Sequence, residues 1–522
     1  MSARAVLAVA PETRVNPLRE ESVTLKAADP CTFVVFGASG DLTHRKLIPA
    51  LFRLSKQKLL HPQTAIIGFA RREWTDERFR EEMKHTVESA GATPSEWDRF
   101  ARSLFYQTGV FEDHVAFRAL GQLLSKVEEE RALPGNRIFH FATPPSEYAT
   151  LIRNIGAAGL AKRALREENA VPWARVIIEK PFGHDLASAR ELNALVHTVF
   201  AEKQVYRIDH YLGKETVQNI LVFRLGNGIF EPLWNNRYVE QVQITVAESA
   251  GIEGRAAYFD NAGISRDIFQ NHMMQLLTLT AMEPPARFEA DAVRDEKAKV
   301  LRTLHPMTPE EVARDTVRAQ YALGAVGGAP VVGYRQEPDV DPKSTVETYM
   351  AARVHVDNWR WSGVPFYLRT GKHLARRATE IAIVFRQPPF SLFRSMGCEN
   401  IEANVLRLRI QPDEGISLSF GSKSPGQALH IDPVQMDFFY LTAFGQDPPE
   451  AYERLLLDCN LGDSTLFARR DEVELAWAFV DPILAAWRDG KGPRLSSYPA
   501  GTWGPDDADE LLHRHGSHWY RL

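Results

Sequence analysis

The chain has 522 residues, more than the roughly 250 to 300 at which a single hydrophobic core stops growing, so at least two domains are expected. Its 44% hydrophobic and 25% charged residues are typical of a globular protein, and a net charge of -5 argues against a general attraction to nucleic acid or acidic membranes. No apolar run approaches the ~18 residues of a membrane-spanning helix. We therefore expect neither a nucleic-acid partner nor a membrane.

Charged residues are spread through the first 30 residues, and the only apolar stretch there, near residues 5–10, is shorter than a signal-peptide core. We interpret residues 1–30 as a disordered extension. The cysteines Cys31, Cys398 and Cys459 are few and lack the C-x-x-C spacing of a thiolate metal site or a disulfide framework. A reducing, cytoplasmic location is therefore expected.

The first structural signal is an apolar run at residues 32–36 followed by Gly37-Ala-Ser-Gly40-Asp-Leu. This pattern predicts a buried strand that enters the glycine turn of a dinucleotide-binding fold, where backbone N–H groups approach a pyrophosphate at a helix N-terminus. The third glycine of G-x-G-x-x-G is missing, so a plain tight turn is the alternative. Pro49 predicts that the next helix is kinked or starts late.

A second apolar strand, residues 64–69, leads into Ala70-Arg71-Arg72. An enzyme that uses NAD would carry an acidic residue near this place, to bind the ribose hydroxyls. A positive charge favours NADP instead, because Arg71 can pair with the 2′-phosphate. The alternative is a solvated strand edge.

Two further strands follow, from Arg137 toward Tyr148 and at residues 174–178, with a charged helical stretch at residues 161–169 between them. Alternating strands and helices predict a parallel sheet covered on both faces. The last strand ends in Glu179-Lys180-Pro-Phe-Gly. Lys180 would thus lie beyond the carboxyl ends of the strands, where ligands bind in such folds, unless it is only a surface lysine before a turn.

Residues 207–215 read Arg-Ile-Asp-His-Tyr-Leu-Gly-Lys-Glu, a density of polar groups that suits a ligand site or a polar network. Lys214, His210 and Tyr211 can each donate to phosphate oxygens, His210 when protonated, and Asp209 can orient another imidazole. A solvated charged loop is the alternative.

Beyond residue 207 the pattern changes to an alternation of polar and apolar residues, which is typical of half-buried strands. One large, mainly antiparallel sheet covered on one side is predicted from residues 238–248, 380–385, 404–411, 416–420 and 434–440. Apolar residues recur at helical spacing from Ile264 to Leu276, and His272 lies within that stripe. Taken alone, such a histidine is more often a core residue.

These motifs, in this order, resemble those of the glucose-6-phosphate dehydrogenase family. The matching strings are G-A-S-G-D-L with Lys46 and Pro49 after it, E-K-P-F-G, R-I-D-H-Y-L-G-K-E and R-D-x-x-x-N-H, which ends at His272. The resemblance runs from about Phe33 to the C-terminus. It implies an α/β protein: a Rossmann-like dinucleotide-binding domain at residues 31–206, then an α+β substrate-binding and oligomerisation domain with the large sheet at residues 207–522.

The resemblance also implies an activity, oxidation of D-glucose 6-phosphate at C1 to 6-phospho-D-glucono-1,5-lactone with reduction of NADP, the first step of the pentose phosphate pathway, without a metal. His272 would be the catalytic base, held by Asp209. The substrate contacts would be Lys180, His210, Tyr211, Lys214, Glu248, Asp267, Lys372, Arg377 and Gln411. The cofactor contacts would be Gly37, Ser39, Gly40, Asp41, Leu42, Lys46, Arg71, Tyr148 and Lys180.

Two alternatives stay open. One is a dehydrogenase for a different sugar phosphate, because Lys214, His210 and Lys372 specify a phosphate better than they specify glucose. The other is a catalytically silent NADPH-sensing regulator, against which the presence of both Asp209 and His272 argues. Because family members are dimers or tetramers and the large sheet offers a surface, a homodimer or homotetramer is expected.

Overall fold

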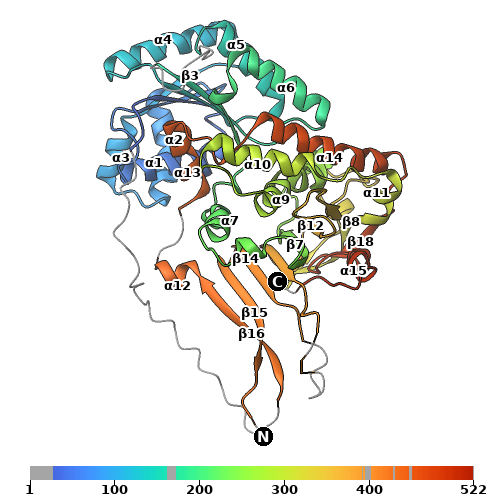
Figure 1. The fold of residues 1–522 in the computed structure, drawn as a ribbon. Helices are drawn as coiled ribbons and strands as arrows, with labels where there is room; N and C mark the ends of the chain where they lie inside the picture. Colours follow the sequence, from blue (N-terminus) through green and yellow to red (C-terminus); the bar gives the residue numbers. More distant parts are fainter. Residues whose placement is uncertain are drawn as a thin grey trace.

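The computed structural model describes residues 27–161, 172–390, 392–393, 401–426, 429–445, 449–520 and 522 (Figure 1). The predicted helix at residues 161–169 lies outside the described residues except for its first residue, and so do Cys398 and most of the predicted N-terminal extension. Within the described part, no helix combines the length and the apolar character needed to cross a membrane.

The N-terminal part is built on a seven-stranded sheet in the order β17-β6-β5-β4-β1-β2-β3. All neighbouring strands are parallel except β17, which pairs antiparallel with β6. The six parallel strands follow the order of a doubly wound dinucleotide fold. The strands are β1 (Thr32–Phe36), β2 (Ala65–Ala70), β3 (Leu104–Thr108), β4 (Arg137–Phe141), β5 (Ala174–Ile178), β6 (Val205–Ile208) and β17 (Phe467–Ala468).

Helices cover both faces of this sheet, as predicted, and alternate residues of β1 show it: Phe33 and Val35 belong to one hydrophobic core, Val34 and Phe36 to another. The first core lies under α1 (Ile48–Lys56), α2 (Asp76–Ser89), α3 (Pro94–Ala101) and α13 (Ala451–Leu461). The second lies under α4 (His114–Glu130), α5 (Tyr148–Ala157) and α6 (Leu186–Val199). The late helix α13 and strand β17 therefore pack on the N-terminal sheet.

The irregularity expected at Pro49 takes the form of a π-helical turn, Thr43–Leu47, immediately before α1. Proline lacks the N–H of a regular helix, and its ring collides with the carbonyl four residues earlier. The widened turn lets the helix continue through Pro49, so the helix begins directly after the glycine turn.

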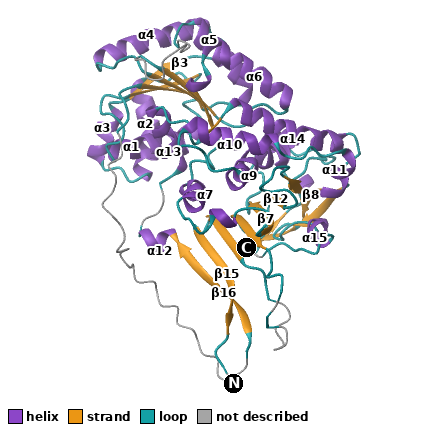
Figure 2. Cartoon of the chain, in the orientation of Figure 1, coloured by secondary structure: helices purple, strands orange, loops and turns teal. Residues whose placement is uncertain are grey.

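The C-terminal part contains a nine-stranded sheet in the order β16-β15-β14-β13-β7-β12-β11-β8-β18. Figure 2 draws its strands in orange. Only the β7–β12 and β8–β18 pairs are parallel, so the prediction of a large, mainly antiparallel sheet is confirmed. Its strands are β7 (Val239–Ala247), β8 (Thr316–Ala322), β11 (Tyr349–His355), β12 (Pro365–Gly371), β13 (Ala378–Phe385), β14 (Val405–Gln411), β15 (Gly415–Lys423), β16 (Ile431–Phe439) and β18 (Leu495–Pro499).

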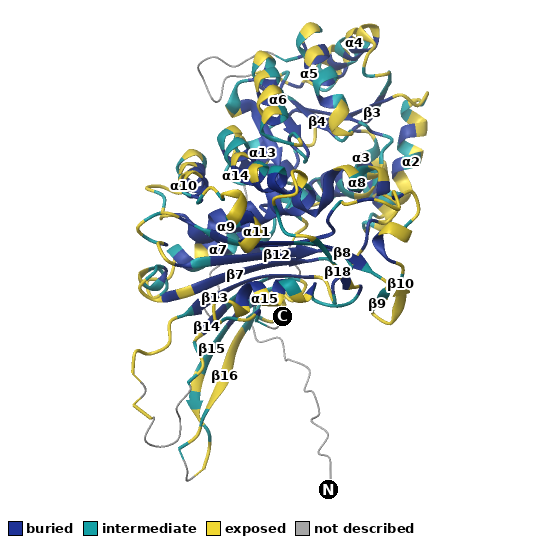
Figure 3. Ribbon diagram, turned by 90° about the vertical axis from the view of Figure 1, so that its right-hand side faces the viewer, coloured by how far each residue is buried: buried dark blue, intermediate teal, exposed yellow. Residues whose placement is uncertain are grey.

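One face of this sheet carries most of the helices, while α15 and the C-terminal residues lie on the other (Figure 3). Strands β15 and β16 extend beyond the helical layer. Besides four short 3-10 helices, the remaining elements are α7 (Glu215–Leu225), α8 (Ala256–Ile264), the π-helix η5 (Ser265–Met273), α9 (Met274–Ala281), α10 (Ala290–Arg302), α11 (Pro309–Asp315), α12 (Tyr440–Phe444), α14 (Arg470–Arg488), α15 (Asp506–His513) and the hairpin β9 (Gly324–Val326) with β10 (Ala329–Val331).

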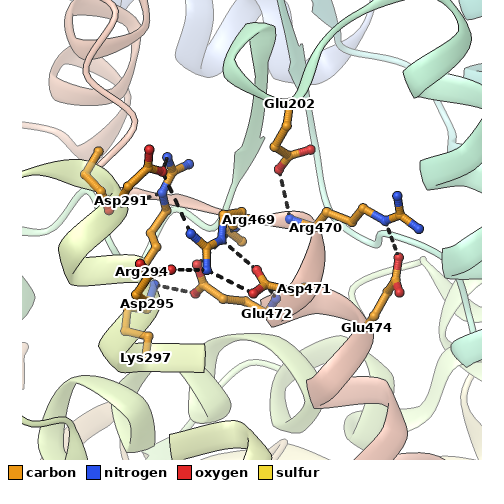
Figure 4. A network of polar contacts seen from close by, with 12 residues as sticks. Glu202, Asp291, Arg294, Asp295, Lys297, Arg469, Arg470, Asp471, Glu472 and Glu474 are labelled. Atoms are coloured by element: carbon orange, nitrogen blue, oxygen red, sulfur yellow. Dashed lines mark hydrogen bonds and ion pairs between the residues drawn. The ribbon is translucent and has the colours of Figure 1, made fainter. Parts of the chain in front are cut away.

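A polar network joins α10, α14 and the segment that leads into β6 (Figure 4). Lys297 of α10 and Glu472 of α14 form an ion pair of 2.7 Å, with both side chains at most 1% exposed. Glu202 accepts a hydrogen bond from the backbone N–H of Arg470 at 2.9 Å and pairs with Arg207 of β6 at 2.6 Å. The start of α14 is thereby tied to the strand that carries the predicted substrate motif.

Candidate active site

The residues singled out from the sequence follow four strands of the parallel sheet. Gly37 follows β1, Arg71 follows β2, Lys180 follows β5 and Asp209 follows β6. Because the carboxyl ends of parallel strands meet at one edge of a sheet, the predicted cofactor and substrate residues share that edge.

Asp209 and His272 form a buried pair. Nδ1 of His272 lies 2.5 Å from Oδ1 of Asp209, and the backbone N–H of Tyr211 donates to the same oxygen at 3.0 Å. An ionised carboxylate makes Nδ1 the donor, so the lone pair of the imidazole is on Nε2. That Nε2 has no hydrogen-bond partner among the described residues. The pair therefore has the form of a general base with its orienting carboxylate.

Burial and charge act in opposite directions on this pair. Burial alone would raise the pKa of Asp209, but the imidazole of His272 and the hydrogen bonds to the carboxylate lower that pKa to about 2. Burial lowers the pKa of His272, although Asp209 acts to raise it. Burial also holds the pKa of His210 well below its usual range, so His210 is neutral and offers one N–H rather than the protonated donor envisaged from the sequence.

The π-helical winding of η5 brings Asp267 and His272 to the same side. A π-helix bonds residue i to residue i+5, which stacks residues five apart, whereas an α-helix would turn them away from each other. The element begins after Gly263, whose φ of +67° and close approach to Glu347 leave no room for a side chain. The apolar periodicity predicted a helix here, and that prediction is correct, but it gave no sign of the wider winding.

Lysines and carboxylates form a second group. The buried Lys372 pairs with Glu248 at 2.5 Å and with Asp267 at 3.2 Å. Lys180 donates to the backbone carbonyl of Asp267 at 2.7 Å and pairs with its carboxylate at 3.2 Å. Burial would raise the pKa of Asp267, but Lys180 and Lys372 together hold it well below its usual range. Two carboxylates therefore neutralise Lys372, which places it among groups suited to hydroxyls rather than to a phosphate.

Lys214 and Arg377 form a third group around a neutral amide. Both donate to Oε1 of Gln411, Arg377 at 3.0 Å. Nε2 of Gln411 donates to Tyr211 at 3.3 Å and to Thr379 at 3.0 Å. Among the described residues neither cation has a carboxylate within ion-pair distance. Burial and Arg377 lower the pKa of Lys214 to about 8, although the carboxylates of Glu414 and Asp209 act to raise it. This positive charge, which no direct ion pair neutralises, suits a phosphate.

Thr379 was not expected from the sequence. Its hydroxyl also contacts that of Tyr211 at 3.2 Å, and it lies on β13, where a threonine is an ordinary strand residue and carries no functional signal. Tyr211 itself stacks on His272, with ring centroids 4.3 Å apart. The predicted cofactor residue Tyr148 is buried and donates to the backbone carbonyl of Glu179 at 3.0 Å, so it supports the turn that carries Lys180.

The glycine turn meets the steric demands of a dinucleotide site. Gly37 has φ of +85°, and a Cβ there would lie 2.2 Å from the carbonyl oxygen of Ala142. Arg71 is exposed and has no ion pair or hydrogen bond to any described residue, whereas Arg72 lies over the ring of Trp74 at 5.3 Å. A backbone cradle beside an unpaired arginine fits the pyrophosphate and the 2′-phosphate of NADP.

The rest of the predicted cofactor loop is partly engaged in contacts within the protein. Lys46 pairs with Glu450, the residue before α13, at 2.9 Å, and Asp41 pairs with Arg45 at 2.6 Å. The backbone N–H of Gly40 closes the turn on Gly37 at 2.9 Å. Ser39 and Leu42 lie half-buried beside Gly40.

Asp209, His210 and His272 could also hold a metal ion, since one ligand atom of each lies within 4.8 Å of the others. A metal there would replace the hydrogen bond between Asp209 and His272. The donor set therefore fits a metal less well than it fits a hydrogen-bonded base.

Both parts of the chain match one family. Residues 34–219 match the family model "Glucose-6-phosphate dehydrogenase, NAD binding domain", and residues 221–520 match "Glucose-6-phosphate dehydrogenase, C-terminal domain". The chain belongs to the glucose-6-phosphate dehydrogenase family. The resemblance and the fold class inferred from the sequence are thereby confirmed.

Relatives within the glucose-6-phosphate dehydrogenase family match over nearly their whole length. Glucose-6-phosphate 1-dehydrogenase 2 of Mycobacterium tuberculosis is 47% identical over 511 residues, 97% of this chain and 98% of the relative. Glucose-6-phosphate 1-dehydrogenase of Bacillus subtilis is 42% identical over 491 residues, 94% of this chain and 98% of the relative.

Solved structures agree. A glucose-6-phosphate dehydrogenase in complex with its substrate glucose-6-phosphate superimposes with a TM-score of 0.85 and 35% identity, covering 96% of this chain and all of that one (100%). The glucose-6-phosphate 1-dehydrogenase of Mycobacterium avium gives a TM-score of 0.77 and 34% identity, covering 95% and 99%.

Proposed function

We propose that this chain is a glucose-6-phosphate 1-dehydrogenase, which oxidises D-glucose 6-phosphate at C1 to 6-phospho-D-glucono-1,5-lactone and reduces NADP to NADPH. The single observation that carries this proposal is the buried Asp209–His272 pair, whose free Nε2 has the form of a base. Membership of the family supports it.

His272 is the catalytic base in this proposal. Its Nε2 takes the proton of the C1 hydroxyl, while Asp209 keeps Nδ1 protonated and stabilises the imidazolium that forms. A neutral imidazole at neutral pH is what this role requires, and burial lowers the pKa of His272 accordingly. Bound NADP supplies the hydride acceptor.

The two lysine-containing groups orient the substrate. Lys214 and Arg377 bind the phosphate, because no direct ion pair neutralises their charge, with His210, Tyr211 and Gln411 around them. Four side chains bind sugar hydroxyls through carboxylates and ammonium groups that already pair with one another: Glu248, Asp267, Lys180 and Lys372. Holding both ends of the sugar fixes C1 against the base.

The glycine turn and Arg71 bind the cofactor. The N–H groups of Gly37, Ala38 and Gly40 already donate to backbone carbonyls, so the backbone N–H groups of residues 39, 41 and 42 are the ones that bind the pyrophosphate. Arg71 pairs with the 2′-phosphate, so NADP is preferred to NAD. Lys46 adds a cation when it leaves Glu450, Lys180 lies where it touches both ligands, and Tyr148 supports the turn before Lys180.

Initial rates with glucose 6-phosphate, measured separately with NADP and NAD, test the proposal. We expect rapid formation of NADPH, a higher kcat/KM with NADP, and very poor turnover of free glucose. Faster turnover of another sugar phosphate would overturn the substrate assignment. Intact cofactor binding without any turnover would favour a silent regulator.

We also propose that copies of the chain assemble as a homodimer or homotetramer in the cytoplasm. Strand β16 is the edge of the nine-stranded sheet and exposes Val434 and Met436, the kind of unpaired edge that a second copy covers. The free thiols of Cys31 and Cys459 suit a reducing compartment. The proposed domains remain residues 31–206 and 207–522, with residues 1–30 as an extension.

A further inference from the structure

A small cavity of about 40 Å³ adjoins the carboxylate of Asp209. Its wall comes from four separate segments: the end of β5, the end of β6, the junction of η5 with α9, and the first turns of α14. Besides Asp209, the side chains that matter are Lys180, Arg207, Gln275 and Glu472. A cavity of this size holds at least one water, which needs roughly 10–15 Å³.

Four buried polar atoms among the residues that line this cavity have no hydrogen-bond partner among the described residues. One of them, Oε2 of Glu472, is held by its ion pair with Lys297 at 2.7 Å. The other three are Oδ2 of Asp209, Oε1 of Gln275 and Nε of Arg207. Their side chains belong to residues that are 4%, 7% and 2% exposed. Two of the atoms accept and one donates. A water molecule has two hydrogens to donate and lone pairs to accept, so its valences match this set.

The backbone brings these residues to the same side. Arg207 lies on β6 and Asp209 follows directly after the end of that strand, and both residues line the cavity. Gln275 follows His272 by three residues in a continuous helical segment and therefore shares the face that meets Asp209. The elements that carry the base and its carboxylate also carry the walls of the cavity.

We propose that one ordered water occupies this cavity, donates to Oδ2 of Asp209 and Oε1 of Gln275, and accepts from Nε of Arg207, which makes Gln275 a positioning residue for the base. The proposal rests on the function proposed above. Oδ1 of Asp209 already bonds His272, and the water holds the other oxygen, so the carboxylate cannot rotate away from Nδ1.

The charges around the cavity explain why an uncharged glutamine fits there. The charged residues that line it are Glu179 and Lys180 directly after β5, Arg207 of β6, Asp209 directly after β6, and Glu472 of α14. Glu472 is paired with Lys297 of α10 (Figure 4). A neutral acceptor at Gln275 takes the second hydrogen of the water without adding another negative charge beside Asp209.

A high-resolution crystal structure of the full chain is the first test. We expect a fully occupied water within hydrogen-bond distance of Oδ2 of Asp209 and Oε1 of Gln275. A lack of electron density for a water at this position, or a direct hydrogen bond between Gln275 and Asp209, would overturn the proposal. This test does not measure activity, so its result is independent of whether the proposed substrate is turned over.

Kinetics of Gln275→Met and Gln275→Glu are the second test. Losing the acceptor should lower kcat about tenfold with KM for the sugar phosphate within twofold. The acid limb of kcat/KM should move to higher pH, because a carboxylate with fewer donors holds the imidazolium proton more tightly. Gln275→Glu keeps an acceptor oxygen but adds a negative charge beside Asp209, so it should move the acid limb to a still higher pH than Gln275→Met does.

Gln320→Met is the matched control. Gln320 is equally buried on β8 and donates to the carbonyls of Ser344 and Val346, away from the Asp209–His272 pair. It should lower stability and leave kcat and the pH profile unchanged. If Gln275→Met behaves in the same way, Gln275 is only structural and the proposal is wrong.

Discussion

At the scale of single residues, the chemistry depends on which charges the fold compensates. Lys372 and Lys214 both come from motifs rich in charge, yet Lys372 is neutralised by Glu248 and Asp267, while Lys214 shares a neutral amide with Arg377. An ammonium held by two carboxylates does not attract a phosphate strongly. A pair of cations without a direct ion pair does, and in the proposed function this difference sets the direction in which the substrate lies.

Replacing His272 by asparagine should remove the base and keep the approximate volume. We expect kcat to fall by about 10² to 10⁴, with KM within a few-fold of the unmodified protein. His305→Asn, at a partly exposed histidine paired with Asp357, is the control and should leave kcat unchanged. Near-normal turnover in His272→Asn would make this residue a core histidine.

Lys214→Ala should raise KM for glucose 6-phosphate about 10- to 100-fold, because a charge-assisted contact of roughly 1.5–3 kcal/mol is lost from both the bound substrate and the transition state. Turnover at saturation should change little. Lys126→Ala, at an exposed lysine on α4, is the control. An unchanged KM in Lys214→Ala would show that the phosphate lies elsewhere.

The pH dependence of the same KM is a separate prediction. Burial and Arg377 lower the pKa of Lys214 to about 8, so the ammonium is charged below that pH and neutral above it. The substrate phosphate stays dianionic over this range. KM measured from pH 7 to pH 9.5 should therefore rise as Lys214 loses its proton. The rise should be absent in Lys214→Ala, and a parallel rise in both proteins would contradict the assignment.

Arg71→Ala should raise KM for NADP tenfold or more and leave KM for NAD within about twofold, because only NADP carries the 2′-phosphate. Arg72→Ala tests the neighbouring cation, which lies over Trp74 and should matter less. If Arg72→Ala changes the ratio of the two KM values and Arg71→Ala does not, Arg72 binds the phosphate.

At the scale of elements, two features hold the helical segment that carries the proposed base, His272, in position. Its π-helical part aligns Asp267 with His272, and α14 packs beside it with the ion pair between Glu472 and Lys297 behind it. Removing one partner of a buried pair leaves an uncompensated charge, which is strongly destabilising, whereas removing both is much less so.

Lys297→Met should therefore lower the free energy of unfolding by about 3–5 kcal/mol, and adding Glu472→Gln should recover most of the loss. Urea denaturation followed by circular dichroism measures both. Lys299→Met is the control, since Lys299 lies on the same helix and pairs with Glu296 at 2.6 Å but is exposed. A double variant as unstable as Lys297→Met would show that the ion pair is not the cause.

At the scale of the whole molecule, the N-terminal sheet carries the proposed cofactor loop, and the C-terminal part supplies Glu248, Asp267, Lys372 and Gln411 to the proposed active site. Strands β15 and β16 extend away from both (Figures 1 and 3). An edge strand that exposes apolar residues is an unfavourable surface for an isolated chain in water.

Met436→Asp should therefore weaken assembly. Met436 is 62% exposed near the middle of β16, and a carboxylate there would be buried without a partner when two copies meet. Light scattering coupled to size exclusion should give a lower mass than for the unmodified protein. Val115→Asp, 60% exposed on α4, should leave the mass unchanged. The same mass for all three proteins would place the interface elsewhere.

Much of the N-terminal fold could be predicted because its signals are local. A buried strand, a glycine with positive φ and the start of a helix each depend on a short stretch of sequence. Gly37 and the strands at residues 32–36 and 174–178 could therefore be predicted from their immediate neighbours. The strands at residues 349–355 and 365–371 were missed, because a run buried on both faces lacks the alternation that marks a strand.

The sequence by itself determined the family, the doubly wound half and the identity of most candidate site residues, since each depends on a short motif. Only the tertiary structure decided how those residues pair. Asp209 meets His272 across 63 positions, Lys372 meets Glu248 across 124, and Lys214 meets Gln411 across 197. Which cation is neutralised and which remains free depends on packing between distant segments, and no local pattern encodes that packing.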